Sequence, residues 1–292
     1  MLKIENTEVM GWEHAIRGMR NPKNSWEKSD SHWDYGKQRV ECITVSHFDD
    51  AEFSIGPNDQ KLMMTLRNAG TDHRKFMRMI TVYLDITAPL YWWKEFDTYK
   101  VGTVANSCST MHKIAAKEFT LDDFSHEHLV DDLDVRIEIG GTDHRDTGPM
   151  EVLGMTIDVL NHYREKYLVA TKTEEYTGLP AKDIWWQMIQ LLPSSYNQKR
   201  TVMLNYEVLA NIYKSRRHHK LDEWHTLCDR IESLPYSALI TGTAVLHHSG
   251  CYDTIIKRNH AQKVHRLLWK EVVRLWLNAT ILTFWMVVIL WV

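Results

Sequence analysis

Two segments of the 292-residue chain concentrate side chains that suit chemistry, residues 88–113 and residues 192–224. In the second segment, a helix predicted over Lys199–Ser215 would project Asn205, Asn211 and the following Arg216 from neighbouring faces. Amides offer a donor and an acceptor to a heterocycle, and a guanidinium suits a carbonyl or phosphate that gains negative charge. The pattern indicates a site for a heterocyclic ligand, although a plain helix surface or contacts between helices would give the same pattern.

The second segment resembles the C-terminal motif of the flavin-dependent thymidylate synthases, which have LP followed by N-x3-L-x-N-x4-R. Here Leu192-Pro193 precedes Asn205, Leu209, Asn211 and Arg216 at similar spacing. The resemblance implies that Asn205 and Asn211 approach the flavin and that Arg216 holds and polarises the uracil of dUMP. A cation beside the pyrimidine would stabilise the negative charge that develops as the ring is activated.

The first segment resembles the same family's frame of a strand, Ala-Pro and a helix with an aromatic-rich end. Ile80–Thr87, Ala88-Pro89 and Tyr91–Trp93 fit that frame. The family's signature RHRxxSxNExSxR follows there, and in this chain it is heavily altered. Thr98-Tyr99-Lys100 replaces RHR, so only Lys100 keeps a positive charge.

Four positions of the altered signature keep a usable side chain. Thr103 falls at the first Ser, and Asn106 and Ser109 keep Asn and Ser after a one-residue insertion. The resemblance implies that these side chains, together with Lys100, line the nucleotide pocket.

At other positions of the family motifs, this chain has different residues. Arg78-Met79 replaces the Glu-His pair before the strand, and Ile189 replaces an arginine four residues before the LP proline. His73 matches a preceding family Gly-His, or substitutes for the lost histidine, and is the further candidate for a flavin contact. Several cationic side chains could restore the lost charge: Arg74, Arg78, Lys94, Lys100 and Lys199.

The resemblance implies a homotetrameric enzyme that methylates dUMP to dTMP. Methylenetetrahydrofolate would donate the carbon, reduced FAD would carry the hydride, and NADPH would be the reductant. The flavin would supply the redox chemistry, and the protein would supply positioning and electrostatics. The alternative is a catalytically divergent or inactive nucleotide-binding protein on the same fold, because the lost charges should weaken the binding of phosphates.

Two other chemistries remain open on pattern alone. Cys108 with His112 four residues on could form a nucleophile and its base, although no third orienting group is evident. His225 and Cys228 share a helix face near His218-His219, but no further ligand has convincing spacing, so we expect no metal site.

The elements that position these residues predict an α+β fold, with helices packed around a mostly antiparallel sheet, like that of the thymidylate synthase family. Lys3–Val9 and Ile80–Thr87 are the predicted strands. The amphipathic helix Met150–Leu168 would bury Val152, Met155, Val159, Tyr163 and Tyr167. The other predicted helices are Asp59–Ala69 with Asp59 as a cap, His73–Met79, Pro89–Phe96, Leu121–Val130, Ala181–Leu192, Lys199–Ser215 and Lys220–Ser233.

Residues 11–34 form a Trp-rich segment, and its polar part Arg17–Asp34 is predicted as a long loop. Trp12, Trp26 and Trp33 would pin this loop to the body of the protein or stack on a ligand. In the same segment, a compact set of polar side chains could face a ligand: His14, Arg17, Arg20 and Asn24.

Composition limits the possible partners and the cellular compartment of the protein. A formal net charge of −3 and a pI of about 6.6 argue against a nucleic-acid partner. The four cysteines form no CxxC pair, and the acidic N-terminus has no apolar run, so a protein of the reducing cytoplasm is expected.

The predicted domains are residues 1–233 and a helical extension, residues 234–292. Residues 275–292 contain no charged side chain, and a helix of that length would be about 27 Å long. This tail is a membrane anchor, a buried terminal helix or a contact between subunits.

Overall fold

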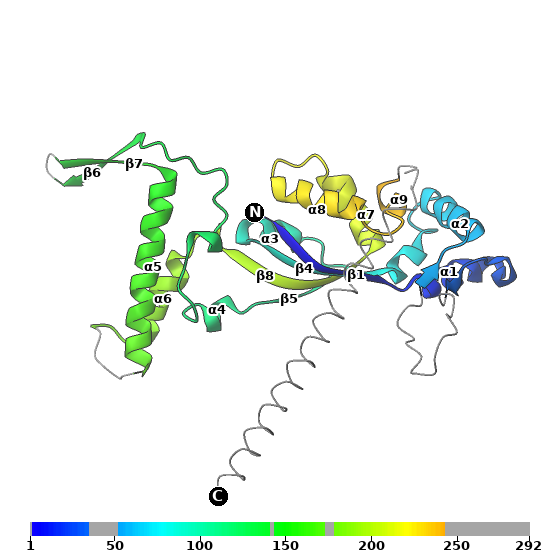
Figure 1. Ribbon diagram of the computed structural model, residues 1–292, viewed down its shortest axis with the longest axis horizontal. Helices are drawn as coiled ribbons and strands as arrows, with labels where there is room; N and C mark the ends of the chain where they lie inside the picture. Colours follow the sequence, from blue (N-terminus) through cyan, green and yellow to red (C-terminus); the bar gives the residue numbers. More distant parts are fainter. Residues whose placement is uncertain (1, 35–51, 141–142, 173–177, 243–292) are drawn as a thin grey trace, which may run out of the picture. The chain divides into compact units, whose positions relative to one another are not determined.

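A computed structural model describes residues 2–34, 52–140, 143–172 and 178–242. Its centre is a four-stranded sheet in the order β1 (Lys3–Met10), β4 (Thr81–Pro89), β8 (Asn197–Asn205), β5 (Val104–Ser107), and every pair is antiparallel (Figure 1). Helices pack on this sheet, so the α+β prediction is confirmed.

Alternating burial explains β4. Val82, Leu84 and Ile86 are at most 1% exposed, while the residues between them are only partly covered. Val202 and Leu204 of β8 belong to the same core, together with α3 (Leu90–Phe96), α7 (Tyr206–Arg216) and α8 (Asp222–Glu232). The predicted strand and the predicted helix after Ala88-Pro89 are therefore confirmed.

The helix predicted over Lys199–Ser215 is wrong in its first half. Residues 197–205 form β8, which pairs along its whole length with β4, from Pro89↔Asn197 to Thr81↔Asn205. β5 pairs with residues 200–203 on the other side, so this part of β8 has strand partners on both edges. Helix α7 begins only at Tyr206, with Asn205 as its N-cap.

The long loop predicted over Arg17–Asp34 is also wrong in part. Helix α1 (Trp12–Arg20) buries Ala15, Ile16 and Met19 at helical spacing, and β2 (His32–Asp34) pairs with β3 (Glu52–Ser54). Arg20 itself is buried, so it does not face a ligand in solution.

Arg20 is held by Asp59, which lies inside α2 (Pro57–Asn68). Arg20 Nε donates to Asp59 Oδ1 at 2.6 Å, and the hydroxyls of Ser29 and Ser31 donate to Oδ2. Asp59 therefore ties α1, the following loop and α2 together. The prediction that Asp59 caps the helix is wrong, because Gly56 is the N-cap.

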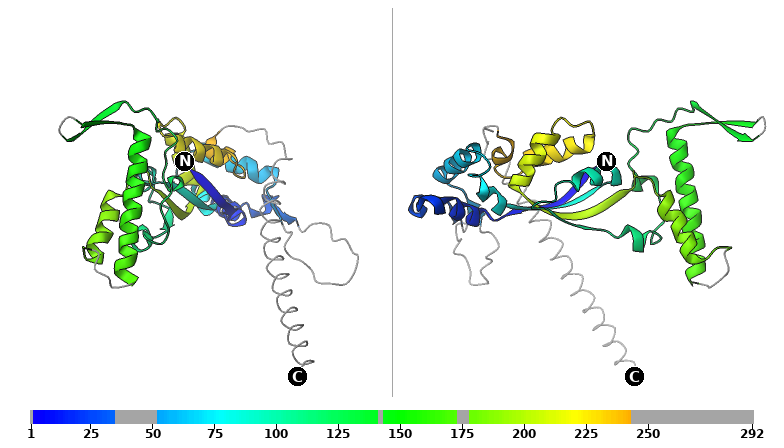
Figure 2. Two further views of the ribbon diagram at one scale, coloured as in Figure 1. Left: turned by 60° about the vertical axis from the view of Figure 1, so that its left-hand side comes forward. Right: turned by 180° about the vertical axis from the view of Figure 1, so that it is seen from behind.

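A second core joins α5 (Pro149–Lys172) and α6 (Ala181–Leu191) to residues 114–124; the two helices lie side by side in each view of Figure 2. The buried face of α5 is Leu153, Ile157 and Leu160. Val152 and Val159 are exposed instead, so the predicted buried face is only partly right. Tyr163 and Tyr167 pack at its edge.

Two other predicted helices are shorter than expected. Lys75–Met79 forms the 3-10 helix η4, and the Leu121–Val130 helix is reduced to the 3-10 turn η5 (Leu121–Asp123), capped by Thr120. The remaining elements are α4 (Thr110–Lys113), the hairpin β6 (Val135–Gly140) and β7 (Asp143–Thr147), α9 (Ala238–Thr241), and the 3-10 turns η1 (Asn21–Lys23) and η2 (Trp26–Lys28).

Leu234, Leu239 and Ile240 pack into the first core. Within the described ranges, no helix is both long and apolar enough to cross a membrane. Residues 275–292 lie outside these ranges, so the anchor, and the division of the chain after residue 233, stay predictions.

We expect Asp59→Asn to lower the free energy of unfolding by about 3–5 kcal/mol at pH 7, because it leaves Arg20 buried without its counter-charge. Burial alone would raise the pKa of Asp59, but hydrogen bonds from Ser31, Ser29 and Arg20 hold this pKa below its ordinary value. The stabilisation is therefore complete above about pH 5 and is lost as the pH falls through the folded-state pKa.

Urea denaturation of both proteins from pH 7 to pH 3 measures this effect. The exposed Asp131→Asn is the matched control, with an expected change within about 0.5 kcal/mol. A loss caused by Asp59→Asn that did not shrink at low pH would contradict the assigned role of the carboxylate.

Candidate functional site

The two motif segments meet where β8 ends. Asn205 Oδ1 accepts from the backbone N–H of Val208 at 3.1 Å, which caps α7. Its Nδ2 faces the carbonyl of Gly102 at 3.5 Å, so the turn that replaces the family signature lies beside Asn205. The amide thus positions the turn and the helix against one another.

Arg216 lies at the other end of α7, in a cluster of aromatic side chains. Its Nη1 donates to Glu95 Oε2 at 2.8 Å and its Nε to the hydroxyl of Tyr99 at 3.0 Å. The guanidinium carbon lies 4.7 Å from the ring centre of Trp224, and the indole N–H of Trp224 also donates to Glu95 Oε2, at 3.1 Å. Coulomb attraction and cation–π attraction both fix Arg216, so the structure neutralises its charge inside the chain.

Asn211 projects into a different place, which we name the basic pocket. This pocket has a volume of about 530 Å³ and is lined by Arg67, Arg74, Asn211, Lys214, Arg217 and His218, among others. Arg74 reaches Asn211 Oδ1 at 3.4 Å and Glu207 at 3.4 Å. No acidic side chain lines the pocket among the described residues.

The charges of the basic pocket are only partly balanced. Glu207 pairs with Arg74 and Arg78, and Asp229 pairs with Arg217 at 2.9 Å. In contrast, within the described ranges Arg67 donates only to the backbone carbonyls of Leu239 and Ile240 and to an amide side chain. Burial, followed by the nearby charge of Arg74, lowers the pKa of Arg67. An anion in this pocket would meet cations that have no acidic partner in the described part of the chain.

The structure separates Asn211 from Arg216. Five helical residues turn a side chain by about 140° around the helix axis. Leu209 and Ile212 of the same helix are fully buried, so the two polar groups lie on different sides of a packed element. The sequence-based placement of Asn205, Asn211 and Arg216 on neighbouring faces of one helix is therefore wrong within a single copy.

The remaining candidates are spread along β5 and the turns. His73 and Lys100 are exposed. Asn106 of β5 pairs with Thr201 of β8, and Ser109, two residues after β5, accepts from the backbone N–H of His112 to cap α4. Both therefore lie away from the end of β8 where Asn205 stands. The hydroxyl of Thr103 is buried and has no hydrogen-bond partner in the described ranges, which suits a ligand group in the turn beside Asn205.

The alternative chemistries gain no support from geometry. Burial raises the pKa of the Cys228 thiol to about 11, which keeps it protonated and a poor metal ligand. No cluster of three or more metal-binding side chains occurs among the described residues. Cys108 is exposed, and His112 lies within the short helix α4, which Ser109 caps.

Sequence reasoning missed Glu95, Tyr99 and Trp224 as partners of Arg216. Glu95 lies in the last turn of α3 and Tyr99 in the turn that follows the helix, so their closeness in sequence is a signal that they lie in one region. Glu95 and Arg216 are separated by 121 positions, however, and only tertiary structure brings them into contact.

The chain is similar to solved structures of nucleotide-methylating enzymes. It resembles a flavin-dependent thymidylate synthase, ThyX from Helicobacter pylori complexed with FAD and dUMP, at 13% identity, over 82% of this chain and 98% of that one, with a TM-score of 0.50. A UMP/dUMP methylase, PolB from Streptomyces cacaoi bound with 5-Br dUMP, matches at 14% identity over 80% and 89%, with a TM-score of 0.46.

No protein-family model matches the chain, and no curated protein matches it. The likeness to the Helicobacter structure shows that the fold of this chain resembles the ThyX fold.

We expect Glu95 and Arg216 to stabilise the fold jointly. The double-mutant cycle of Glu95→Gln and Arg216→Gln should give a coupling energy of about 1–2 kcal/mol, as for hydrogen-bonded charged groups in contact. Urea denaturation measures the free energies of unfolding. Lys94→Gln, exposed on the same helix, is the control and should show no coupling to Arg216→Gln. Strict additivity of the Glu95 and Arg216 substitutions would contradict the contact.

Proposed function

We propose that the protein binds a uridine nucleotide and methylates it as flavin-dependent thymidylate synthases do. The reaction would convert dUMP to dTMP in the cytoplasm, with methylenetetrahydrofolate, FAD and NADPH in the roles given above. The observation that carries the proposal is the basic pocket beside Asn211, on a fold that resembles the ThyX fold. Cations without acidic partners suit phosphate groups, which both FAD and dUMP carry.

The residues present fit a flavin nucleotide in part. Arg67 and Lys214 would hold phosphate oxygens, and Arg74, which also pairs with Glu207, would assist them. The amide of Asn211, which has one long contact among the described residues, would bond a ring edge. Asn205 and His73 are the further proposed contacts of the flavin. The bound flavin would supply hydride chemistry, and the protein groups would orient it and exclude water.

On the nucleotide side, we propose Arg216 as the residue that polarises the uracil. Lys100, Thr103, Asn106 and Ser109 would line the nucleotide pocket. The hydroxyl of Thr103 supports this assignment best, because it is buried without a partner among the described residues and a ligand would satisfy it. Assembly into a homotetramer would let residues that lie apart in one copy contribute to one site.

One observation favours a second function, a nucleotide-binding protein without methylase activity. Glu95 already neutralises Arg216, and Trp224 and Tyr99 enclose it. An arginine that must first leave a carboxylate polarises a substrate less well than a free one, because the competing ion pair has to be broken.

The visible absorption spectrum of the purified protein, with FAD and dUMP added in turn, tests flavin binding. We expect oxidised flavin bands that dUMP perturbs. Arg74→Ala should weaken FAD binding about tenfold, as for the loss of one charge-assisted hydrogen bond. Lys61→Gln, an exposed lysine on α2 outside the pocket, is the control and should leave the affinity unchanged. A protein that stays colourless with excess FAD would overturn the flavoenzyme proposal.

Formation of dTMP under reducing, anaerobic conditions separates the two functions. If the protein is a methylase, Arg216→Ala should lower kcat by about 10²–10³, as for the loss of one electrostatic stabiliser of a developing anion. Glu95→Gln should leave methylation intact, because it frees Arg216. Bound flavin and dUMP without any dTMP would support the second function instead.

A further inference from the structure

A second pocket, away from the basic pocket and from the Arg216 cluster, has the size and lining of a small-molecule site. It lies between α4, the C-terminal end of α5 and the N-terminal end of α6, and its volume is about 550 Å³. Pockets for small molecules are of this size and are lined mainly by apolar and aromatic groups with a few polar ones. We name it the α4–α6 pocket.

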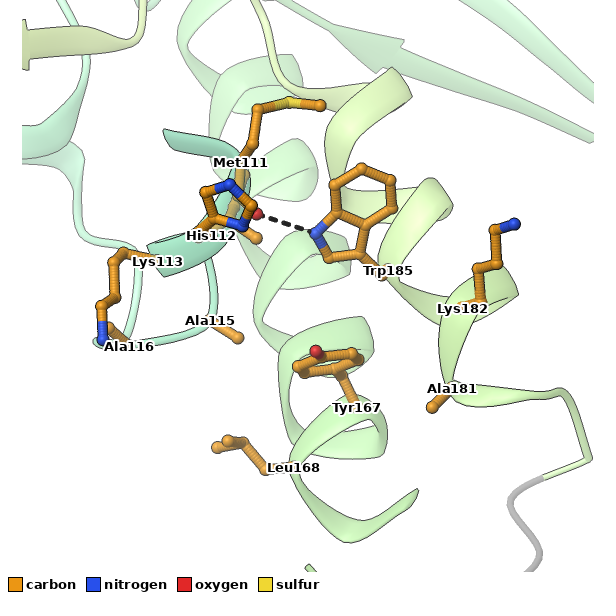
Figure 3. Close-up of a pocket in the computed structure, with 11 residues that line it drawn as sticks. Met111, His112, Lys113, Ala115, Ala116, Tyr167, Leu168, Ala181, Lys182 and Trp185 are labelled. Carbon is orange, nitrogen blue, oxygen red and sulfur yellow. Dashed lines mark hydrogen bonds between the residues drawn. The ribbon is translucent and has the colours of Figure 1, made fainter. Parts of the chain in front are cut away.

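The lining of the α4–α6 pocket combines two aromatic side chains with an apolar floor. Figure 3 shows Trp185 of α6 and Tyr167 of α5 on the same side, facing α4 and the residues after it. Ile114, Ala115 and Leu168 supply much of the apolar surface. Trp185 and Tyr167 are partly buried against the second core, so their rings hold fixed positions while part of each stays accessible.

Hydrogen bonds make the walls of this pocket rigid. The indole N–H of Trp185 donates to the carbonyl of Met111 at 3.0 Å, drawn as the dashed line in Figure 3. Arg164 Nε donates to the carbonyl of Ala115 at 3.2 Å, and the amide of Asn161 bonds both the N–H and the carbonyl of Phe119. A preformed pocket binds with a smaller ordering cost than one that must assemble around its ligand.

The charges at the rim are of one sign. Lys113 and Lys182 stand on opposite sides of the pocket, and His112 lies next to Trp185 (Figure 3). No acidic residue lines the pocket, and neither lysine has an ion-pair partner, within the described ranges. The charge of an occupant should therefore be negative, and its shape should be flat enough to stack on the indole.

We propose that the α4–α6 pocket binds a planar aromatic ring that carries a carboxylate. The ring packs on Trp185 and Tyr167, and the carboxylate faces the rim of the pocket, where Lys113 and Lys182 supply positive charge. This site is separate from the basic pocket and from the Arg216 cluster, and it does not depend on the function proposed above.

Three probes separate the parts of this proposal. Naphthalene-2-carboxylate has the ring and the charge, naphthalene-2-carboxamide has the ring alone, and cyclohexanecarboxylate has the charge alone. In calorimetric titrations of the full chain, we expect the first to bind about threefold more tightly than the second, since exposed ion pairs contribute up to about 1 kcal/mol. Cyclohexanecarboxylate should bind most weakly, because it cannot stack.

Substitutions assign the binding to the pocket. The double variant Lys113→Gln and Lys182→Gln should abolish the preference for the carboxylate over the carboxamide and leave the carboxamide affinity unchanged. Trp185→Leu should weaken both aromatic probes about fivefold, in line with the loss of one aromatic contact. Trp185→Phe, which retains a ring, should recover most of that loss, so a general effect of unfolding is distinguished from loss of stacking.

The control variants are Lys61→Gln, on α2, and Arg74→Ala, in the basic pocket; both should leave naphthalene-2-carboxylate binding unchanged. Equal affinity for the carboxylate and the carboxamide, or no saturable binding in the millimolar range, would overturn the proposal. So would a double lysine variant that changes self-association in sedimentation velocity but not probe binding, because the pocket would then be a contact between copies of the chain.

Discussion

The pairing of β4 with β8 over nine residues is the constraint on which the rest of the structure depends. Helix α3 leaves β4 at one end of this pair, and α7 leaves β8 at the other end, because the strands are antiparallel. The strand pair is about 30 Å long, and the summed length of α3 and α7 is nearly the same, about 27 Å. Two helices that start at opposite ends of the pair therefore end close to one another. Both helices run back over the same buried face, so their C-terminal ends meet. That is why Glu95 and Arg216, far apart in sequence, share a hydrogen bond.

The converging helix ends also explain the charges found there. The last carbonyls of a helix carry partial negative charge, which favours a cation at that place. Arg216 supplies this cation in the last turn of α7, and the aromatic rings of Tyr99 and Trp224 shield it from water. Glu95 on its own would be unfavourable at a helix C-terminus. It is tolerated because Arg216 and the indole N–H of Trp224 satisfy its carboxylate.

The local spacing of hydrophobic residues predicted the elements whose pattern is unambiguous, such as β4 and the helix after Ala88-Pro89. The prediction failed where two signals compete. Buried Val202 and Leu204 alternate with Thr201 and Met203 as in a strand, but the Asn-rich motif that follows suggested a longer helix. Asn205, a favoured N-cap residue, is the boundary signal that could have corrected this. Helix α1 was missed for another reason. Its last residue, Arg20, is buried because Asp59, 39 positions away, compensates the charge, and a local sequence pattern cannot show a partner at that distance.

The separation of the basic pocket from the Arg216 cluster limits what one copy of the chain can do. Helix α7 lies between them, and its Leu209 and Ile212 are fully buried, so no ligand can pass through the helix. A ligand that reached from Asn211 to Arg216 would have to go around a packed element. A single copy therefore keeps two groups of polar side chains apart, one rich in cations and one with a guanidinium enclosed by aromatic rings. Chemistry that needs both in contact requires residues from a second copy, because rearranging α7 would expose the core that holds the sheet.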